Sequence, residues 1–549
     1  MSYPRPGNQF WNVPELVAEV CEYLANDDLC ACARVSRTVS RHALRKLYKD
    51  GVRLHDIFEI LGPLTLNGSR GEVFFAEKPS YREWQRFCHY ARYVESLSFS
   101  HVKSLRSISD EAFLDILFVA PPGSVIFPRL RSLKWSDTRS QYMRRFNLFV
   151  TASLRDLTLS SPMQLLHGIF GMLSRSSPNL RCLSVDIPHN ITNVPATILH
   201  ELTAALMTFR DLQRVEIPSA FLTVDVFRLL SEKDIKTLSV RSCPHAYMEL
   251  CPFEDTALRF ANTPFSSLTH LSCEIDLLLL GEGKRLAARS LRALNLHVPA
   301  SIAEDRLTSC AKLLADRCDE LDSLSLLITR PVLAGDVSSP ITARVLTSFL
   351  IAIPGLLILD IDDSVPVSIS GPELELLAPL CHNLVELNTC THALGRRLNN
   401  PPGLGSLIPF AKHCRDLKVL GIYMDATHVP NHSPEIHASF TQLRQLNVYH
   451  GMEIIDESAV AEYLGNFLSP DTQVCLKSST RQETTISLAA LSAQVFDWAW
   501  KWEQVDAWLV DRKPFRELIV PAFTQMRTID KIFDDIERAS RTRNQPVPF

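Results

Sequence analysis

Residues 318–326 read CDELDSLSL, and residues 381–389 (CHNLVELNT) and 414–422 (CRDLKVLGI) repeat the same order of apolar positions. In the first segment these positions are Leu321, Leu324 and Leu326. The last two are separated by one residue, so they point to the same face of a short strand. The pattern recurs in order from Val94 to Val448, about thirteen times and about 29 residues apart, which indicates an internal repeat.

The segments between these strands carry apolar residues at helical spacing, as in residues 163–173, 198–209 and 341–353. A single strand–helix unit cannot bury its apolar side, but a stack of such units can. The pattern resembles the leucine-rich repeat. The fold that we expect is therefore α/β, a curved solenoid with parallel strands inside and helices outside. A weaker strand is expected at Val474 and Leu476.

Three cysteines keep a fixed place in the repeat. Cys318, Cys381 and Cys414 each lie three residues before the first leucine of a unit. This position predicts packing in the turn between helix and strand, and it resembles the cysteine-containing class of leucine-rich repeats. The segment CHNLVELNTCTH at 381–392 could otherwise suggest a metal site. Because its first cysteine follows the repeat, we expect neither a metal ion nor a cofactor.

Residues 10–50 follow a different pattern. An apolar stripe predicts a first helix that starts near Pro14, and apolar segments at 29–35 and 39–48 predict two more. Three short helices in about 40 residues make a small core, of a size that tends to need a partner. Apolar side chains left outside that core would form a contact surface.

The order of residues in this region resembles the F-box. That family opens with a Pro-Glu-Leu-like turn, continues through Tyr-Leu, Asp-Leu and Ala-x-Val-Ser-Arg segments, and closes with Ala-Leu-x-x-Leu-Tyr. The corresponding residues here are 14–16, 23–24, 28–29, 33–37 and 43–48. Where the family usually has a tryptophan after the Val-Ser-Arg segment, this chain has Val39. With the repeats that follow, the layout resembles fungal F-box proteins with leucine-rich repeats.

This resemblance implies an adaptor role. In that family the F-box docks on a Skp-type adaptor, which links to a cullin scaffold and a RING subunit, while the repeats hold a protein substrate for ubiquitin transfer. By carry-over, the residues expected to contact the adaptor or to form the domain core are Pro14, Leu16, Val17, Val20, Leu29, Val35 and Leu44. The simpler interpretation of each is packing inside the three-helix core.

Residues between the strand leucines would face the concave side of the solenoid. In the late units this strip combines acidic and tyrosine side chains, and the candidate substrate-binding residues are Asp360, Asp362, Glu386, Tyr423 and Tyr449. Adjacent carboxylates beside aromatic rings would suit a basic peptide with an aromatic or apolar anchor. The alternative is a solvated polar face without a ligand.

The remaining segments complete the expected organisation. We expect a disordered start at 1–9, the F-box-like three-helix domain at 10–50, a linker or N-terminal cap of the solenoid at 51–93, and the solenoid at 94–490. A helical cap is expected at 491–540, because Trp498, Trp502, Val505 and Leu509 fit one helical face and solenoids need covered ends. A docking helix for a partner is the alternative interpretation of that segment. Residues 541–549 are expected to be disordered.

Composition narrows the class of protein. The chain has 549 residues and a formal net charge of −4, so it has no strongly basic field that would gather nucleic acid. Its apolar runs are too short for a bilayer-spanning helix, so we expect no membrane partner. The 14 cysteines are scattered, and the first ten residues carry no signal-peptide pattern. We therefore expect reduced thiols and a cytoplasmic or nuclear location.

No GxSxG, HExxH, P-loop or GxGxxG motif is present, so we expect a non-catalytic protein. Three functions remain open. The first is substrate recognition in a Skp–cullin–F-box ubiquitin ligase. The second is a protein-binding scaffold or inhibitor that is not coupled to ubiquitin transfer, and it differs from the first because it needs no adaptor at residues 10–50. The third is a receptor that also holds a small molecule, which would need an enclosed pocket.

Overall fold

The computed structural model describes residues 11, 13–49, 51–67, 72–100, 107–136, 145–188, 194–241, 265–279, 289–299, 302–329, 341–363, 365–389, 401–430, 439–449, 452–468, 472–477 and 501–507. The chain divides into two compact units, Met1–Leu291 and Arg292–Phe549. Each unit is described by itself.

The first unit opens with three helices, α2 (Pro14–Tyr23), α3 (Asn26–Cys32) and α4 (Arg37–Lys49), which we call the head. Helix α2 starts where Pro14 fixes a helical φ and needs no N–H partner, and Glu15 lies in the positively polarised first turn. In α4, Val39, Ala43 and Leu44 are buried and the basic side chains face outward. The three helices predicted over residues 10–50 are thus present.

The repeats of the first unit consist of strands joined by helices. Its main sheet is parallel, and the strands follow chain order. These strands are β1 (Val52–Arg53), β4 (Ser96–Ser100), β6 (Ser132–Ser136), β7 (Asp156–Ser160), β8 (Cys182–Asp186), β9 (Arg214–Pro218), β10 (Thr237–Arg241) and β11 (His270–Glu274). The helical elements are α5 (Leu54–Phe58), α6 (Tyr81–Ala91), α7 (Asp110–Val119), η1 (Met163–Leu165), α9 (Ile169–Ser176), α10 (Ala196–Thr208), η2 (Ser219–Phe221), α11 (Val224–Ser231) and α12 (Ile275–Leu279).

A small second sheet precedes the regular repeats. Strand β2 (Leu64–Asn67) pairs antiparallel with β3 (Glu72–Phe75), and β3 pairs parallel with β5 (Ser107–Ile108). Strands β2 and β3 lie within residues 51–93, the segment expected to link the head to the solenoid, and β5 lies in the first repeat after it. Nothing in the leucine pattern predicted it.

The second unit has the same construction. Its parallel strands, again in chain order, are β12 (Ala293–Pro299), β13 (Ser323–Thr329), β14 (Ile358–Asp362), β15 (Glu386–Asn388), β16 (Val419–Gly421), β17 (Gln445–Tyr449) and β18 (Gln473–Lys477). The helical elements are α13 (Glu304–Arg317), α14 (Ala343–Ala352), α15 (Gly371–Leu377), η3 (Ala378–Cys381), η4 (Leu404–Leu407), α16 (Ile408–His413) and α17 (Glu457–Gly465). A further helix covers residues 501–507.

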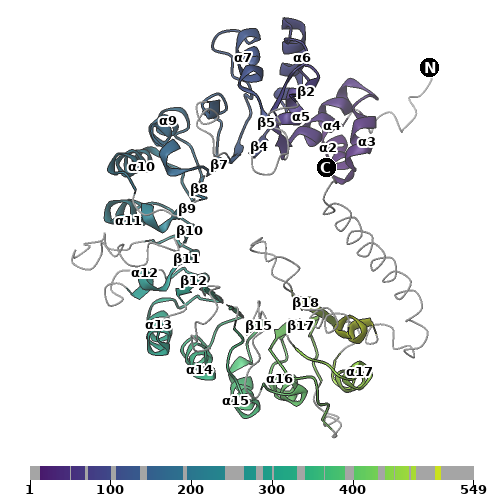
Figure 1. Ribbon diagram of the computed structural model, residues 1–549, viewed down its shortest axis with the longest axis vertical. Helices are drawn as coiled ribbons and strands as arrows, with labels where there is room; N and C mark the ends of the chain where they lie inside the picture. Colours follow the sequence, from purple (N-terminus) through teal and green to yellow (C-terminus); the bar gives the residue numbers. More distant parts are fainter. Residues whose placement is uncertain are drawn as a thin grey trace, which may run out of the picture. The chain divides into compact units, whose positions relative to one another are not determined.

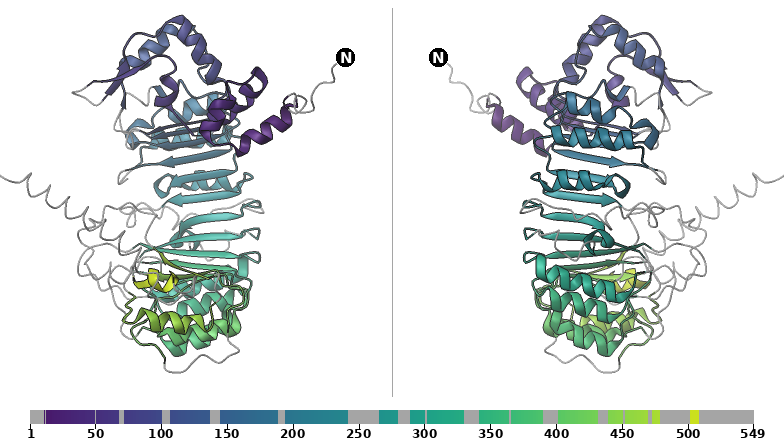
Figure 2. Two further views of the ribbon diagram at one scale, coloured as in Figure 1. Left: turned by 90° about the vertical axis from the view of Figure 1, so that its right-hand side faces the viewer. Right: turned by 90° about the vertical axis from the view of Figure 1, so that its left-hand side faces the viewer.

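Within each unit the strands form one layer and the helices cover one side of it, with successive strands side by side (Figures 1 and 2). Leucine register explains this arrangement, because Leu324, Leu359 and Leu387 are direct cross-strand partners and are fully buried. Residues on either side of each leucine point the other way. The chain is therefore an α/β leucine-rich-repeat solenoid, as the repeat predicted.

The in-phase cysteines pack as expected. Cys318 and Cys414 are the residues directly after α13 and α16, and Cys381 ends η3. All three are buried, and the Cys414 thiol lies 3.4 Å from the carbonyl oxygen of Ala378. Burial raises the pKa of Cys318 to about 11 and that of Cys414 to about 12. These thiols fill the helix-to-strand turn.

Residues 501–507, which lie within the segment expected to form the C-terminal cap, are helical. Trp502 and Val505 are buried, as their helical spacing predicted. Trp502 Nε1 donates to the carbonyl oxygen of Met452, 3.1 Å away, and Asp506 Oδ1 accepts the backbone N–H of Val474 on β18. A carboxylate thus satisfies a donor on the last strand of the unit. Trp498, Leu509 and the termini expected to be disordered, 1–9 and 541–549, lie outside the described residues.

Candidate functional site

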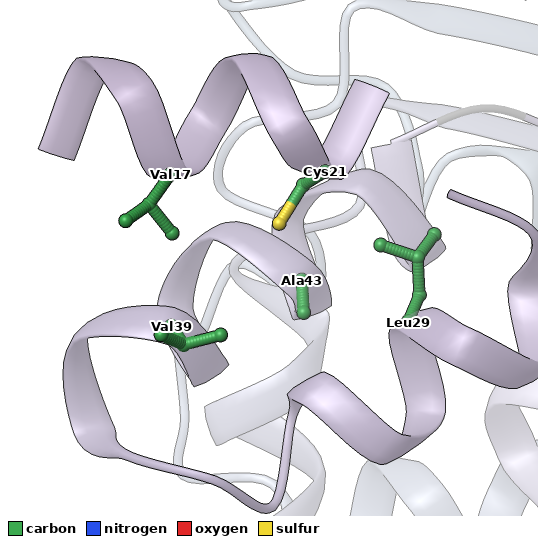
Figure 3. Packing of buried hydrophobic residues seen from close by; sticks show 5 residues of the cluster. All are labelled: Val17, Cys21, Leu29, Val39 and Ala43. Carbon is green, nitrogen blue, oxygen red and sulfur yellow. The ribbon is translucent and has the colours of Figure 1, made fainter. Parts of the chain in front are cut away.

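The head encloses a small apolar core. Val17 and Cys21 from α2, Leu29 from α3, and Val39 and Ala43 from α4 point toward one another and are at most 2% exposed (Figure 3). Leu24, Cys32, Ala33 and Leu47 pack around them. Val39, which stands where the F-box family usually has a tryptophan, is therefore part of this interior rather than of the surface.

The structure divides the seven residues assigned to adaptor contact or to the head core. Val17 and Leu29 are buried in the core of the head, Leu44 is buried, and Val20 is half-buried. Pro14, Leu16 and Val35 are exposed, Leu16 at 45% and Val35 at 73%. The exposed members are the ones that a partner could contact.

Helix α2 presents an apolar face outward. Leu16, Val20 and Tyr23 are spaced by four and three residues, which places them on one side of the helix. Tyr23 is 82% exposed, and its hydroxyl donates to Glu19 Oε1. Trp11 and Val13, which precede α2, are also exposed. A large aromatic and aliphatic surface on so small a domain is typical of a contact site.

The head is fixed to the start of the repeats. Lys46 Nζ lies 2.6 Å from Glu22 Oε2, which holds α4 to α2. Arg45 forms a 3.3 Å ion pair with Glu95 at the entrance to β4, and the rings of Tyr48 and Tyr90 are 5.7 Å apart. Burial raises the pKa of Tyr48, so its hydroxyl stays neutral at physiological pH. These contacts place the head firmly against α6 and β4.

On the second unit, the predicted acidic strip lies on neighbouring strands. Asp360 and Asp362 are on β14, and Glu386 is on β15, where Ile358 is its cross-strand partner. All three side chains are partly exposed. Tyr423 and Tyr449, expected to stand beside them on an open face, are only 5% and 1% exposed. Asp360 Oδ1 is nevertheless buried, and the tyrosines belong to the interior.

A chain of hydrogen bonds runs along this face behind the carboxylates. Gln445 Nε2 donates to Asn447 Oδ1, and Asn447 Nδ2 donates to Asn388 Oδ1. Asn388 Nδ2 in turn donates to Glu386 Oε1. Each of these three donor–acceptor distances is 2.7 Å. Tyr449 donates its hydroxyl to the same Asn388 oxygen, at 3.3 Å. Both asparagines are fully buried, and burial strengthens such bonds. The network therefore fixes the Glu386 carboxylate in one orientation.

The first unit carries a second polar network that the sequence analysis did not single out. The Arg241 guanidinium on β10 pairs with Asp186 Oδ1 at 2.8 Å and with Glu216 Oε1 at 2.6 Å. Ser184 donates to Glu216 and Ser160 donates to Asp186. Asp186 directly follows the last apolar residue of its strand, Val185, just as Asp362 follows Ile361, so the rule that predicted the acidic strip would also have found Asp186. The four strands β7–β10 are thereby locked together.

Other kinds of site find less support. Among the described residues, no three His, Cys, Asp or Glu side chains are grouped in a way that could hold a metal ion. Cys390 and His392 lie outside that part of the chain.

A groove of about 640 Å³ between α13, α14 and α15, edged by Ile351 and Leu376, lies on the helical layer and not on the strand face. No described helix combines the length and apolar character that crossing a membrane requires.

Comparison with known proteins gives fold-level likeness alone. No family model matches the sequence, and no curated protein matches it. Among solved structures, the chain is similar to the yeast Rad7–Elc1 complex, with 11% identity, a TM-score of 0.33, and coverage of 86% of this chain and 90% of the other. It is also similar to the leucine-rich-repeat protein LegL7 from Legionella pneumophila, with 13% identity, a TM-score of 0.27, and coverage of 84% and 98%.

Proposed function

We propose that this chain is the substrate-recognition subunit of a Skp–cullin–F-box type ubiquitin ligase. The head would dock a Skp-type adaptor and, through it, a cullin–RING complex. The strand face of the repeats would bind a protein substrate. In this proposal the chain itself is non-catalytic, needs no cofactor, and acts in the cytoplasm or nucleus.

One observation carries the proposal. The residue order that resembles the F-box coincides with a three-helix head whose apolar residues separate into a buried core and an exposed face. Val17 and Leu29 are buried. Leu16, Tyr23 and Val35 are solvent-exposed, although they are large and mostly apolar. A small domain that keeps such residues exposed is stabilised when a partner covers them.

The attachment of the head supports the same function. Through Arg45 and Tyr48, helix α4 is held against Glu95 at the entrance to β4 and Tyr90 on α6. An adaptor bound at the head would therefore keep a fixed position relative to the neighbouring strands. Transfer of ubiquitin onto a bound substrate depends on such positioning, because the reacting groups must be brought together.

Co-purification with a Skp-type adaptor tests the proposal. The full chain should bind the adaptor, and the double variant Leu16→Asp, Val35→Asp should bind it at least about tenfold more weakly, because both charges would be desolvated at the contact. Both positions are exposed, so the variant should keep its fold. Met207→Asp on α10, where Met207 is 63% exposed in the same unit, is the matched control.

The outcomes separate the candidate functions. Binding that is lost in the double variant and retained in Met207→Asp supports the ligase subunit. If the full chain fails to bind the adaptor, the ligase proposal is wrong, and a protein-binding scaffold or inhibitor without coupling to ubiquitin transfer becomes the leading function.

A further inference from the structure

Helix α7 differs from an ordinary outer helix of a solenoid because it is apolar on two sides. Its inner side buries Ala112, Phe113 and Ile116. Its outer side presents Leu114, Leu117 and Phe118, which are 50%, 45% and 86% exposed. These three are spaced i, i+3 and i+4, so they form one continuous stripe. A helix that is apolar all round is normally covered on both sides.

The helix is held firmly in this orientation. Phe113 packs against Phe58, with ring centroids 5.7 Å apart, and the Arg145 guanidinium lies 4.6 Å from the centre of the Phe113 ring. Arg145 also forms an ion pair with Asp110 in the first turn. Ser109 caps the helix by accepting the backbone N–H of Ala112. The apolar stripe is thus a fixed feature of the surface, not a passing exposure.

Acidic side chains border the stripe. Glu111 and Asp115 are one helical turn apart on the edge next to Phe118, and the helix contains no Lys or Arg. Among the described residues, Asp110 forms an ion pair with Arg145, whereas neither Glu111 nor Asp115 forms an ion pair. Two like charges at this spacing repel each other slightly, and a positive partner would relieve that repulsion.

We propose that the outer face of α7, comprising Leu114, Leu117, Phe118, Glu111 and Asp115, is a docking surface for a basic amphipathic helix of a partner protein. Apolar side chains of that helix cover Phe118 and the two leucines, and its Lys or Arg residues lie against the two carboxylates. Within the first unit, this surface is separate from the apolar face of α2 and from the strand face. The inference therefore does not depend on the adaptor or on the substrate.

Two other occupants fit the surface less well. An anionic membrane would repel Glu111 and Asp115. A second copy of this chain offers α4 as a strongly basic helix, but its apolar residues Val39, Ala43 and Leu44 are already buried. A separate protein with a basic amphipathic helix satisfies both the apolar stripe and the charge.

A model peptide tests the proposal on the full chain. The probe is a fluorescein-labelled 16-residue amphipathic helix of leucine and lysine, and its counterpart carries glutamate at every lysine position. Binding is followed by fluorescence anisotropy. We expect the lysine peptide to bind, and the variant Leu117→Ser, Phe118→Ser to weaken that binding at least about tenfold. The glutamate peptide should not bind.

A second variant separates charge from apolar contact without touching the stripe. Glu111→Lys, Asp115→Lys should lose the lysine peptide and gain the glutamate peptide. Ile351→Ser, at a 63% exposed position on α14, is the control and should bind the lysine peptide like the parent chain. The proposal is overturned if the parent chain binds neither peptide, binds both alike, or binds the lysine peptide undiminished after Leu117→Ser, Phe118→Ser. It is also overturned if sedimentation shows self-association that Phe118→Ser abolishes.

Discussion

The ring of Tyr449 lies directly over Gly421 of the neighbouring strand. A Cβ atom at position 421 would collide with the Tyr449 hydroxyl and would lie 2.5 Å from Asn388 Oδ1. Gly421 and Asn447 are cross-strand partners, and Asn447 donates to Asn388 across the strand that carries the glycine. The missing side chain at Gly421 is therefore what allows the hydrogen-bonded chain to form.

Gly421→Ala should destabilise the second unit. Inserting a methyl group into filled space forces the tyrosine or the asparagine to move, at a cost of about 1–3 kcal/mol. Thermal or urea unfolding measures this, and Tyr449→Phe in the same chain should recover part of the loss because it removes the nearest atom. Gly355→Ala is the control, since a Cβ there meets nothing within 4 Å. Equal effects of the two glycine substitutions would contradict the packing described for Gly421.

Asn388→Asp should make stability depend on pH. Asn388 is buried, and its Nδ2 donates to Glu386 Oε1 at 2.7 Å, so a buried carboxylate at position 388 would face the partly exposed carboxylate of Glu386. Like charges and burial both raise the pKa of such a pair in the folded state. Stability would therefore be lost as the pH rises through the raised value and regained in acid.

Melting temperatures at pH 5 and pH 8 test this expectation. The difference between the variant and the parent chain should be larger at pH 8. Asn295→Asp, at an exposed position on β12, should show no such dependence. A variant that is equally destabilised at both pH values would mean that the two carboxylates do not face each other.

The leucine spacing predicted the solenoid because burial of Leu324 and its equivalents depends only on side-chain alternation along each strand. The same alternation predicted that Tyr449 lies on the face of the strand opposite to the buried leucines, and its position in the strand agrees with this. Its burial could not be predicted, because the ring folds back over Gly421 through cross-strand register. The exposed apolar stripe of helix α7 could not be predicted either, because the sequence does not distinguish a buried phenylalanine from an exposed one such as Phe118. Asp186 could have been found, because it directly follows the last apolar residue of its strand, as the predicted strip residue Asp362 does.

Thiol reactivity should separate the exposed Cys30 of the head from the buried cysteines of the repeats. Burial raises the pKa of Cys310 and Cys414 to about 12 and raises that of Cys381 well above its usual value. Since the thiolate is the reactive form, these residues should resist iodoacetamide in the folded protein at pH 8. Cys30 is exposed and should be alkylated first.

Mass spectrometry of the alkylated chain identifies each site, and the same reaction in denaturant provides the control, in which all cysteines should react at similar rates. Fast labelling of Cys381 or Cys414 in the folded protein would show that the helix-to-strand turns open readily.

Trp502→Ala should loosen the C-terminal helix from the last repeats. Trp502 is 1% exposed and donates to Met452, and truncating a buried tryptophan costs about 3–5 kcal/mol. We expect faster proteolysis near residues 501–507 and a tendency to aggregate, because an uncovered strand can pair with another chain. Glu503→Ala, at an exposed position of the same helix, should behave like the parent chain. If both variants resist protease equally, this helix does not cap the solenoid.

Asp506→Asn should stabilise the same contact at neutral pH. Burial raises the pKa of Asp506 above its ordinary value of 3.8, although the N–H of Val474 favours the charged form. A raised pKa means that the folded protein holds the proton more tightly than the unfolded chain does. This group therefore contributes most stability below about pH 3.8, and the contribution is lost as the pH rises through the folded value. An asparagine keeps an acceptor for the Val474 N–H without the buried charge. Its melting temperature should fall less than that of the parent chain between pH 4 and pH 7, and a steeper fall would show that the charged carboxylate is what holds the strand.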